Sequence, residues 1–563
     1  MNSTAEKLDI LWDDLNLDYE GENKYTSFFS SNGNLHTYPA KAVPEMVNEL
    51  IKKINSIYTV EKVLDPFVGS GTTALESKYL GMDFWGSDLN PLAVLLTKTK
   101  VLTIENTSYT KKRLREFLKT LEEEYVLTTI IPIVSFDRID YWFKKDNIRE
   151  LSYIKYRIEL FLKGSNRAKR EMYALILLTA FSTTIRKVSL TRNGEFKLYR
   201  MSPNDIEKFS INGVTTFVES VNNLLDMLVV ANNSYKKRTI CDVYVKNAKK
   251  LDYLDEQSID LVITSPPYGD SKTTVAYGEF SKLSILWMKD LMEKYAEITT
   301  SEANCDEILL GGRKSDWKLD DEMFFYSKTL QALFGQINNQ IRDSKRELDE
   351  AKQILSEMKE VISKGEYVTE ELLKKNTLLY QLICERVRLD IYRKINNNIS
   401  GLSDKKIKKL AKEQMGKYMQ ILCNPSARKW YQYQKKIRIK LNNIDETIER
   451  KIKSLINRKH DITIFLKDLY KVILETDRVL KKGGYQVWIV GHRTIMGKIV
   501  VDMEGIINDW FENLGYHCEA SLNRKYSFKR MPHHINSTIE RCEEIQTMMN
   551  EYILVVRKEV SGK

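Results

Sequence analysis

Cysteine is scarce in this chain, with six residues among 563. None of them forms a CxxC pair; they are Cys241, Cys305, Cys384, Cys423, Cys518 and Cys542. Disulfide-stapled domains and zinc modules both depend on closely spaced cysteines. We therefore expect neither a disulfide framework nor a metal site.

Long apolar segments are also missing. The most apolar helix-like stretch, Met172–Phe181, is too short to span a bilayer and predicts a buried helix. The first residues, MNSTAE, have no basic start and no apolar run behind it, so they do not resemble a secretory signal. We expect a cytoplasmic protein that does not associate with membranes.

Positive charge is unevenly distributed along the chain. The net charge is +11, but residues 331–460 hold 29 basic and 16 acidic residues, or 29 − 16 = +13. The rest of the chain is therefore slightly acidic, at 11 − 13 = −2. Such a basic segment is typical of an element that binds nucleic acid, although an ordinary solvated helix face is the alternative.

The densest part of this segment combines basic and aromatic side chains, which can contact phosphates and stack on bases. The candidate DNA-binding residues are Lys405, Lys406, Lys408, Lys409, Arg428, Lys429, Trp430, Lys435, Lys436 and Arg438. A second basic and aromatic stretch, 525–532, adds Lys529 and Arg530, with an ordinary exposed loop as the alternative.

A short motif, Ser265-Pro266-Pro267-Tyr268, follows the apolar run 259–263, which predicts a buried strand. The motif offers a hydroxyl, carbonyl oxygens without competing N–H groups, and an aromatic face. These groups could hold a planar base by stacking while they orient its exocyclic amine. Alone, the motif could equally end a core strand with a packed tyrosine.

A second motif, DPFVGSGT at 65–72, joins a short apolar strand to a helix-compatible stretch. Gly69 and Gly71 permit a tight turn and a close backbone approach to a ligand at a helix N-terminus. Asp88 ends the next apolar run, where a carboxylate can accept hydrogen bonds from ribose hydroxyls. The alternative for Asp88 is a helix N-cap before Pro91. A dinucleotide site is disfavoured, since no third glycine follows at the required spacing.

Together these motifs resemble the amino-methyltransferases of DNA, which use S-adenosylmethionine. The segment HTYPAK at 36–41 resembles the cofactor motif that precedes the first strand in that family. The resemblance implies a cofactor site formed by Tyr38, Lys41, Asp65, Phe67, Gly69, Gly71, Thr72 and Asp88. Asn247 follows the strand expected at Thr239–Val245, where the family often has an acidic residue, so its role as a ligand is in doubt.

The same resemblance implies that Ser265 and the Pro266 carbonyl accept hydrogen bonds from the target amine, beside Pro267, and that Tyr268 stacks on the flipped base. Family members with Ser before Pro-Pro-Tyr mostly methylate N4 of cytosine, and N6 of adenine is the alternative. Methylation at carbon 5 needs a Pro-Cys motif, and none of the ten prolines precedes a cysteine. Methylation of RNA or of a protein amide, and an inactive DNA-binding protein, are further alternatives.

The expected fold is α/β: a Rossmann-like, seven-stranded methyltransferase core with two largely helical insertions, the longer of which is basic and a candidate coiled-coil arm. We divide the chain into a cofactor-binding part of the core (1–104), a helical insertion (105–235), core with the Ser-Pro-Pro-Tyr motif (236–285), a basic helical insertion that is the candidate target-recognition region (286–461) and the C-terminal part of the core (462–563).

This organisation suggests the partners of the chain. Double-stranded DNA is the expected substrate, a cognate restriction endonuclease acting on the same site is a candidate partner, and the protein is a monomer or a dimer. The helical spacing of apolar residues from Phe325 to Met358 predicts a helical hairpin or coiled-coil arm.

Overall fold

The structure is a computed structural model of the 563-residue chain. It describes residues 12, 36–39, 42–128, 130–192, 197–235, 238–269, 276–300, 305–312, 322–364, 370–377, 379–380, 409–410, 412–414, 430–495, 499–525 and 550–560.

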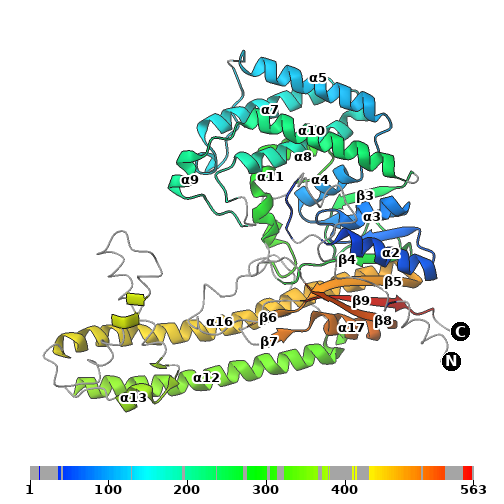
Figure 1. The fold of residues 1–563 in the computed structure, drawn as a ribbon. Helices are drawn as coiled ribbons and strands as arrows, with labels where there is room; N and C mark the ends of the chain where they lie inside the picture. The colour runs from blue at the N-terminus through cyan, green and yellow to red at the C-terminus, as the bar shows by residue number, and fades with distance from the viewer. Residues whose placement is uncertain are drawn as a thin grey trace.

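A seven-stranded sheet forms the centre of the described structure, with the strand order β3-β2-β1-β4-β5-β9-β8 (Figure 1). Every pair from β3 to β5 is parallel, and β9 runs antiparallel to both of its neighbours. The strands are β1 (Lys62–Asp65), β2 (Asp83–Asp88), β3 (Cys241–Val245), β4 (Ile259–Thr264), β5 (Leu480–Gly491), β8 (Tyr516–Lys525) and β9 (Asn550–Lys558). The predicted α/β fold class with a seven-stranded core is confirmed.

The direction of chain growth reverses between β1 and β4. From β1 the chain adds β2 and then β3 on one side, and it then crosses to β4 and β5 on the other. In open α/β sheets, ligands bind beyond the carboxyl ends of the strands at such a switch point. The sheet order therefore places the ends of β1 and β4, where both sequence motifs lie, beside one another.

Both faces of the sheet are buried, so its central strands are apolar along their length. Every residue of β4 is buried. Along β5, Val487 and Ile489 belong to one hydrophobic core, whereas Trp488 and Val490 belong to the other. This alternation follows from the two-residue period of a strand. The apolar composition of these strands is thus the signature of a sheet covered by helices on both sides.

The helices before the arm run from α2 to α11 along the chain, and all of them except α9 contribute buried residues to the first core. They are α2 (Pro44–Ile57), α3 (Thr72–Leu80), α4 (Pro91–Lys100), α5 (Thr107–Tyr125), α6 (Ile139–Trp142), α7 (Lys145–Lys163), α8 (Arg167–Val188), α9 (Pro203–Lys208), α10 (Gly213–Ser234) and α11 (Tyr277–Tyr295). The helix predicted at Met172–Phe181 is the buried centre of α8. Figure 1 shows α5, α7, α8 and α10 as a layered block above the sheet.

Contrary to the expectation that long apolar segments are missing, one described helix of this block, α10, is long and apolar enough by length and composition alone to cross a membrane. Its buried residues include Phe217, Val221 and Leu224, which belong to the first core, and the helix packs against α8. A core helix of a soluble protein satisfies the same criteria.

A long arm of two helices extends from the second core. Helix α12 (Lys328–Ser363) lies beside α16 (Trp430–Val479), with the short α13 (Glu370–Lys374) near the far end (Figure 1). Lys459 Nζ donates to Asn338 Oδ1 at 2.6 Å, and Lys352 Nζ lies 3.5 Å from Glu449 Oε1. The two pairs run in opposite directions along the helices, so the arm is antiparallel. The predicted helical hairpin is confirmed, while the five-part division of the chain stays a prediction.

The C-terminal part of the core adds β6 (Arg493–Ile495), β7 (Ile499–Val501), α17 (Met503–Asn513) and the antiparallel pair β8 and β9. Two boundaries here differ from what the local sequence predicts. The pair Gly483-Gly484 has the turn chemistry of a helix stop, but the preceding helix ends at Val479 and both glycines lie within β5. Leu480 pairs with Ile259 and Tyr485 with Leu261, so the glycines form an irregularity that absorbs extra residues.

The second boundary is the start of the following helix. The apolar spacing predicts a helix over Val500–Leu514, and the helix is present, but Val500 lies in β7 and α17 begins at Met503. The Asp502 side chain accepts a hydrogen bond from the Gly505 N–H at 2.9 Å and so caps the helix. The cap fixes the boundary that apolar spacing alone could not locate.

Gly86 in β2 is the position where packing most clearly requires glycine. A Cβ atom added there would lie 2.3 Å from Val68 Cγ1 and 2.8 Å from the Phe84 ring. We expect Gly86→Ala to lower the free energy of unfolding by about 1–3 kcal/mol, as overpacked cores do. Urea unfolding measures this change. Gly335→Ala is the control, since Gly335 is exposed in α12 with nothing near its Cβ position, and should stabilise by about 0.5–1 kcal/mol. An unchanged Gly86→Ala protein would contradict the packing argument.

Candidate active site

An open cleft of about 660 Å³ lies beyond the carboxyl ends of β1, β2 and β4. Eight residues predicted from the sequence line it: Tyr38, Asp65, Phe67, Gly69, Thr72, Asp88, Ser265 and Pro267. Eight others were not predicted: Ala42, Val68, Ser70, Thr73, Thr264, Tyr277, Leu309 and Ile489. The fold thus brings the two motifs, almost two hundred residues apart, to one cleft.

The turn that contains Gly69 and Gly71 connects β1 to α3 and forms the floor of the cleft. Gly69 and Gly71 have φ angles of +49° and +80°, values that residues with a Cβ rarely adopt. At Gly71 a Cβ atom would also lie 2.7 Å from Thr97 Oγ1. No side chain caps the N-terminus of α3. Its first N–H groups and the positive end of the helix dipole are therefore available to an electron-rich ligand.

Asp88 is fixed by backbone donors from both sides. Its Oδ2 accepts the Gly69 N–H at 3.0 Å, and its Oδ1 accepts the Asn90 N–H at 2.9 Å. The alternative reading of Asp88 as the N-cap of α4 is wrong, because Asn90 is the cap and accepts the Leu92 N–H at 3.1 Å. Each carboxylate oxygen has two lone pairs, so Asp88 keeps acceptor capacity for ligand hydroxyls.

Asp65 links the ends of β1 and β4. The carboxylate is 3% exposed and accepts hydrogen bonds from Thr264 Oγ1 at 2.6 Å and from the Phe67 N–H at 3.0 Å. Burial raises the pKa of Asp65 to about 6, although these hydrogen bonds act in the opposite direction. Burial likewise raises the pKa of Asp88 to about 6 against the N–H groups of Asn90 and Gly69.

Tyr38 and Tyr277 form an aromatic wall of the cleft, and Phe280 packs against Tyr38. The ring centroids of Tyr38 and Tyr277 are 6.0 Å apart, and those of Tyr38 and Phe280 are 5.9 Å apart. The Tyr38 hydroxyl accepts a hydrogen bond from Asn90 Nδ2 at 3.1 Å, and burial raises the pKa of Tyr38 well above its usual value. Asn90 therefore connects the aromatic wall to the helix that follows Asp88.

The Ser-Pro-Pro-Tyr motif begins directly after β4. Ser265 and Pro267 face the cleft, Pro266 is buried, and Tyr268 lies outside the described cleft wall. The Tyr268 hydroxyl donates to Glu551 Oε1 at 2.7 Å and lies 3.3 Å from Ser265 Oγ. Glu551 was not predicted from the sequence, because only the pairing of the C-terminal strands brings it to the motif.

Other predicted site residues lie elsewhere. Asn247 does not line the cleft, and its Oδ1 accepts the Lys249 N–H at 3.0 Å in a local turn. Lys409 is exposed, and Trp430, Lys435, Lys436 and Arg438 lie on the first two turns or so of α16. Lys41, Lys405, Lys406, Lys408, Arg428, Lys429, Lys529 and Arg530 lie outside the described residues. The DNA-binding assignments therefore stay predictions.

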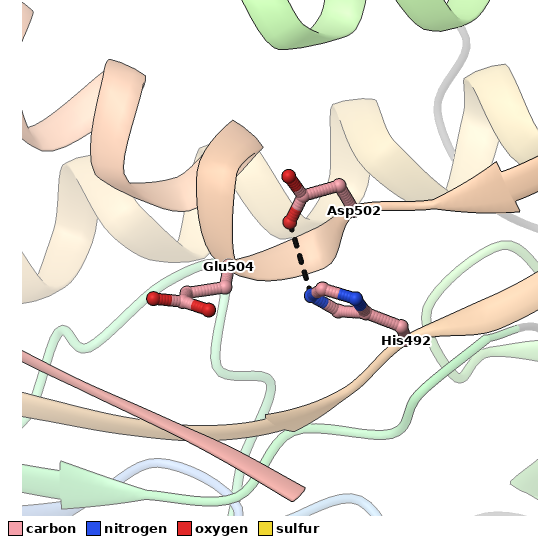
Figure 2. Close-up of side chains that lie close together, drawn as sticks. All are labelled: His492, Asp502 and Glu504. Atoms are coloured by element: carbon pink, nitrogen blue, oxygen red, sulfur yellow. Dashed lines mark ion pairs between the residues drawn. The ribbon is translucent and has the colours of Figure 1, made fainter. Parts of the chain in front are cut away.

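One group of potential metal ligands, His492, Asp502 and Glu504, lies beyond the carboxyl end of β5 (Figure 2). Their ligand atoms lie within 4.8 Å of one another, and His492 Nε2 is 3.0 Å from Asp502 Oδ1. Neighbouring groups already engage all three: His492 stacks on Tyr552, Asp502 caps α17, and Glu504 accepts from Ser521. The imidazole of His492 lowers the pKa of Asp502. These contacts give the group a structural role.

The sheet order, the antiparallel seventh strand and the cleft at the switch point define a methyltransferase-type α/β enzyme. A family profile described as DNA methylase, N6_N4_Mtase, matches residues 2–99. The chain is therefore similar to the N6/N4 DNA methylases at its N-terminal part and to a type II DNA methyltransferase over its full length. The resemblance noted from the motifs is thereby confirmed.

Two curated relatives carry this assignment. The chain is 28% identical over 581 residues to the type II methyltransferase M.MvaI of Kocuria varians, with 100% of each chain covered. It is 27% identical over 180 residues to the type II methyltransferase M.MjaII of Methanocaldococcus jannaschii, covering 30% of this chain and 33% of that protein.

A solved structure, the rRNA methyltransferase aviRa from Streptomyces viridochromogenes, aligns with 50% of this chain and 83% of its own. The identity is 11% and the TM-score 0.19, so the fold assignment rests on the sheet order instead.

Asp65 gives the stability of the protein a testable pH dependence. Its folded-state pKa, about 6, lies above the ordinary value of 3.8, so ionisation costs folding free energy that is absent at low pH. We expect Asp65→Asn, which keeps an oxygen acceptor, to be more stable than wild type at pH 7, by at most about 3 kcal/mol. The advantage should shrink as the pH falls from 6 to 4 in urea titrations.

Thr264→Val provides the matched test, because it removes a hydrogen bond that lowers the pKa of Asp65. In the Thr264→Val background, the pH range over which Asp65→Asn loses its stability advantage should move to higher pH. A difference between Asp65→Asn and wild type that is independent of pH would show that burial does not perturb this carboxyl group.

Proposed function

We propose that this protein transfers a methyl group from S-adenosylmethionine to the exocyclic N4 of cytosine at a specific site in duplex DNA. The observation that carries the proposal is the convergence of Ser265 with Asp65 and Asp88 on one cleft. Both full-length and partial relatives are type II methyltransferases. We further propose that methylation protects DNA from a cognate restriction endonuclease in the cytoplasm.

The residues of the cleft fit S-adenosylmethionine. The remaining acceptor capacity of Asp88 suits ribose hydroxyls, and the glycine turn allows close approach of the ligand to the backbone. Asp65, when ionised, suits the cationic part of the ligand, beside Phe67 and Tyr38. When bound, S-adenosylmethionine supplies a methyl group on a positively charged sulfur. The similarity of this chain to DNA methylases implies that it uses this cofactor.

The motif after β4 has the groups that an amine substrate needs. A base inside a duplex cannot reach the end of β4, so it must be flipped out of the helix. Ser265 Oγ and the Pro266 carbonyl can accept the two N–H groups of the amine and turn its lone pair toward the methyl group. The N–C bond forms as the S–C bond breaks, and the nitrogen then releases one proton. Stacking on Tyr268 would contribute about 1–3 kcal/mol.

The serine before Pro-Pro-Tyr favours cytosine over adenine. Both bases present an exocyclic amine of similar geometry, so the same acceptors can serve either one. N6-adenine is the alternative target and leaves the fold and the chemistry unchanged. RNA and protein amides are less favoured substrates, because the family profile is that of DNA methylases.

The experiment that tests this proposal identifies the methylated nucleoside. The protein is incubated with S-adenosylmethionine labelled in its methyl group and mixed-sequence duplex DNA, which is then digested to nucleosides. We expect N4-methylcytosine. N6-methyladenine would change the target base to adenine, and DNA without label, although S-adenosylmethionine binds, would overturn the DNA proposal. Tyr268→Ala should lower turnover by roughly 10- to 100-fold through lost stacking, with cofactor affinity unchanged.

The basic start of α16 is the second part of the proposal to test. Lys435→Gln, Lys436→Gln and Arg438→Gln together should weaken DNA binding and reduce the slope of log Kd against log salt by about 3, if each contacts a phosphate. The matched control neutralises Lys112, Arg115 and Lys119, which are exposed on α5. Equal effects of the two triple variants would mean that α16 attracts DNA no more than any exposed basic helix.

A further inference from the structure

Glu551 joins the C-terminal strands to the Ser-Pro-Pro-Tyr motif. It lies at the start of β9, opposite Arg524 at the end of β8, and is 5% exposed. Arg524 Nε lies 2.7 Å from Glu551 Oε2, while the Tyr268 hydroxyl lies 2.7 Å from Oε1. The carboxylate thus engages the guanidinium with one oxygen and the phenol with the other. The sequence separation of 283 residues between Tyr268 and Glu551 makes this a purely tertiary contact.

The pairing fixes the direction of the hydrogen bond from Tyr268. A carboxylate held against a guanidinium offers only acceptors, so the phenol must donate its proton to Glu551. The phenolic oxygen then retains lone pairs and can accept from Ser265 Oγ, 3.3 Å away. That distance is long for an O–H···O hydrogen bond, whereas the bond to Glu551 has an ordinary length. The charge-assisted hydrogen bond from Tyr268 to Glu551 is therefore the stronger of the two. It sets the direction in which the Tyr268 and Ser265 hydroxyls donate.

The direction matters for the target amine. An exocyclic amine whose lone pair must remain free for the methyl group can only donate its N–H groups, so Ser265 Oγ must accept. Ser265 can present a lone pair only if its own proton points elsewhere, and the Tyr268 oxygen is the neighbour that can take it. We propose that Glu551 is a positioning residue that sets Ser265 as an acceptor through Tyr268. This inference rests on the proposed transfer to an exocyclic amine.

Glu551→Gln reverses this direction while it preserves the shape of the side chain. Arg524 can only donate, so it should bind the amide oxygen of the glutamine and leave the amide NH2 group facing Tyr268. The phenolic oxygen would then accept from the amide and turn its proton toward Ser265. Ser265 would in turn point its own proton toward the amine, which has no acceptor to offer in the reaction.

The experiment measures single-turnover methylation of duplex DNA at saturating S-adenosylmethionine and DNA in four proteins. They are wild type, Glu551→Gln, Tyr268→Phe and the double variant. We expect each single variant to slow methyl transfer by at least about tenfold, with cofactor affinity near wild type. Glu551→Gln should also lower the thermal midpoint, because it leaves the buried Arg524 guanidinium without its counter-charge. In the Tyr268→Phe background, which keeps the ring but lacks the hydroxyl, Glu551→Gln should cause no further loss.

Each outcome decides the proposal. A Glu551→Gln protein as fast as wild type overturns it. An equal loss from Glu551→Gln with and without the Tyr268 hydroxyl also overturns it, since Glu551 would then act only as a support for the strands. If Glu551→Gln does not fold, Tyr268→Phe tests the proposal, because it leaves the ion pair between Glu551 and Arg524 intact. An unchanged rate in Tyr268→Phe would show that the Tyr268 hydroxyl does not connect Glu551 to Ser265. A wild-type protein that methylates no DNA amine refutes the proposed function itself, and is thereby distinguished from a failed relay.

Discussion

The hydrogen bond from Thr264 to Asp65 is the contact on which the site depends. It joins the last residues of β1 and β4 at 2.6 Å, in a buried position at the switch point of the sheet. The glycine turn and Asp88 lie on one side of this contact, and the Ser-Pro-Pro-Tyr motif begins on the other. Because the strands are parallel neighbours, the two halves of the cleft are held in register by the sheet itself.

Buried or half-buried carboxylates recur around this contact, and each one is matched with donors. Asp65 accepts from Thr264 and Phe67, Asp88 from two backbone N–H groups, and Glu551 from Tyr268 and Arg524. A buried carboxylate without such donors would be strongly destabilising. The raised pKa values of Asp65 and Asp88, about 6, show that the donors compensate only part of the cost of burial. When Asp65 and Asp88 are ionised, they therefore place negative charge in the cleft, and a cationic ligand can offset it.

The two helical insertions connect strands of the sheet, and in their described parts neither of them covers the switch point. The first, between β2 and β3, packs as a block on the core that contains α8 and α10, and the second, between β4 and β5, leaves as the antiparallel arm of α12 and α16. The C-terminal part of α16 packs in the second core through Phe465, Leu469 and Ile473. The arm is thus anchored in the sheet that positions the cleft, while its far end extends away from it (Figure 1).

The sequence by itself located half of the residues that line the cleft and most of the strands that carry them. Glycine spacing, Asp88 and the Ser-Pro-Pro-Tyr motif depend on local chain conformation, which a short window of residues specifies. Boundaries were less accessible: Gly483 and Gly484 looked like a helix stop, and pairing with β4 placed them inside β5. Glu551 could not be found at all, because its side chain acquires a role only when β9 pairs with β5 and β8. Local chemistry follows from neighbours in sequence, whereas partners hundreds of residues apart are chosen by strand register, which only the folded sheet decides.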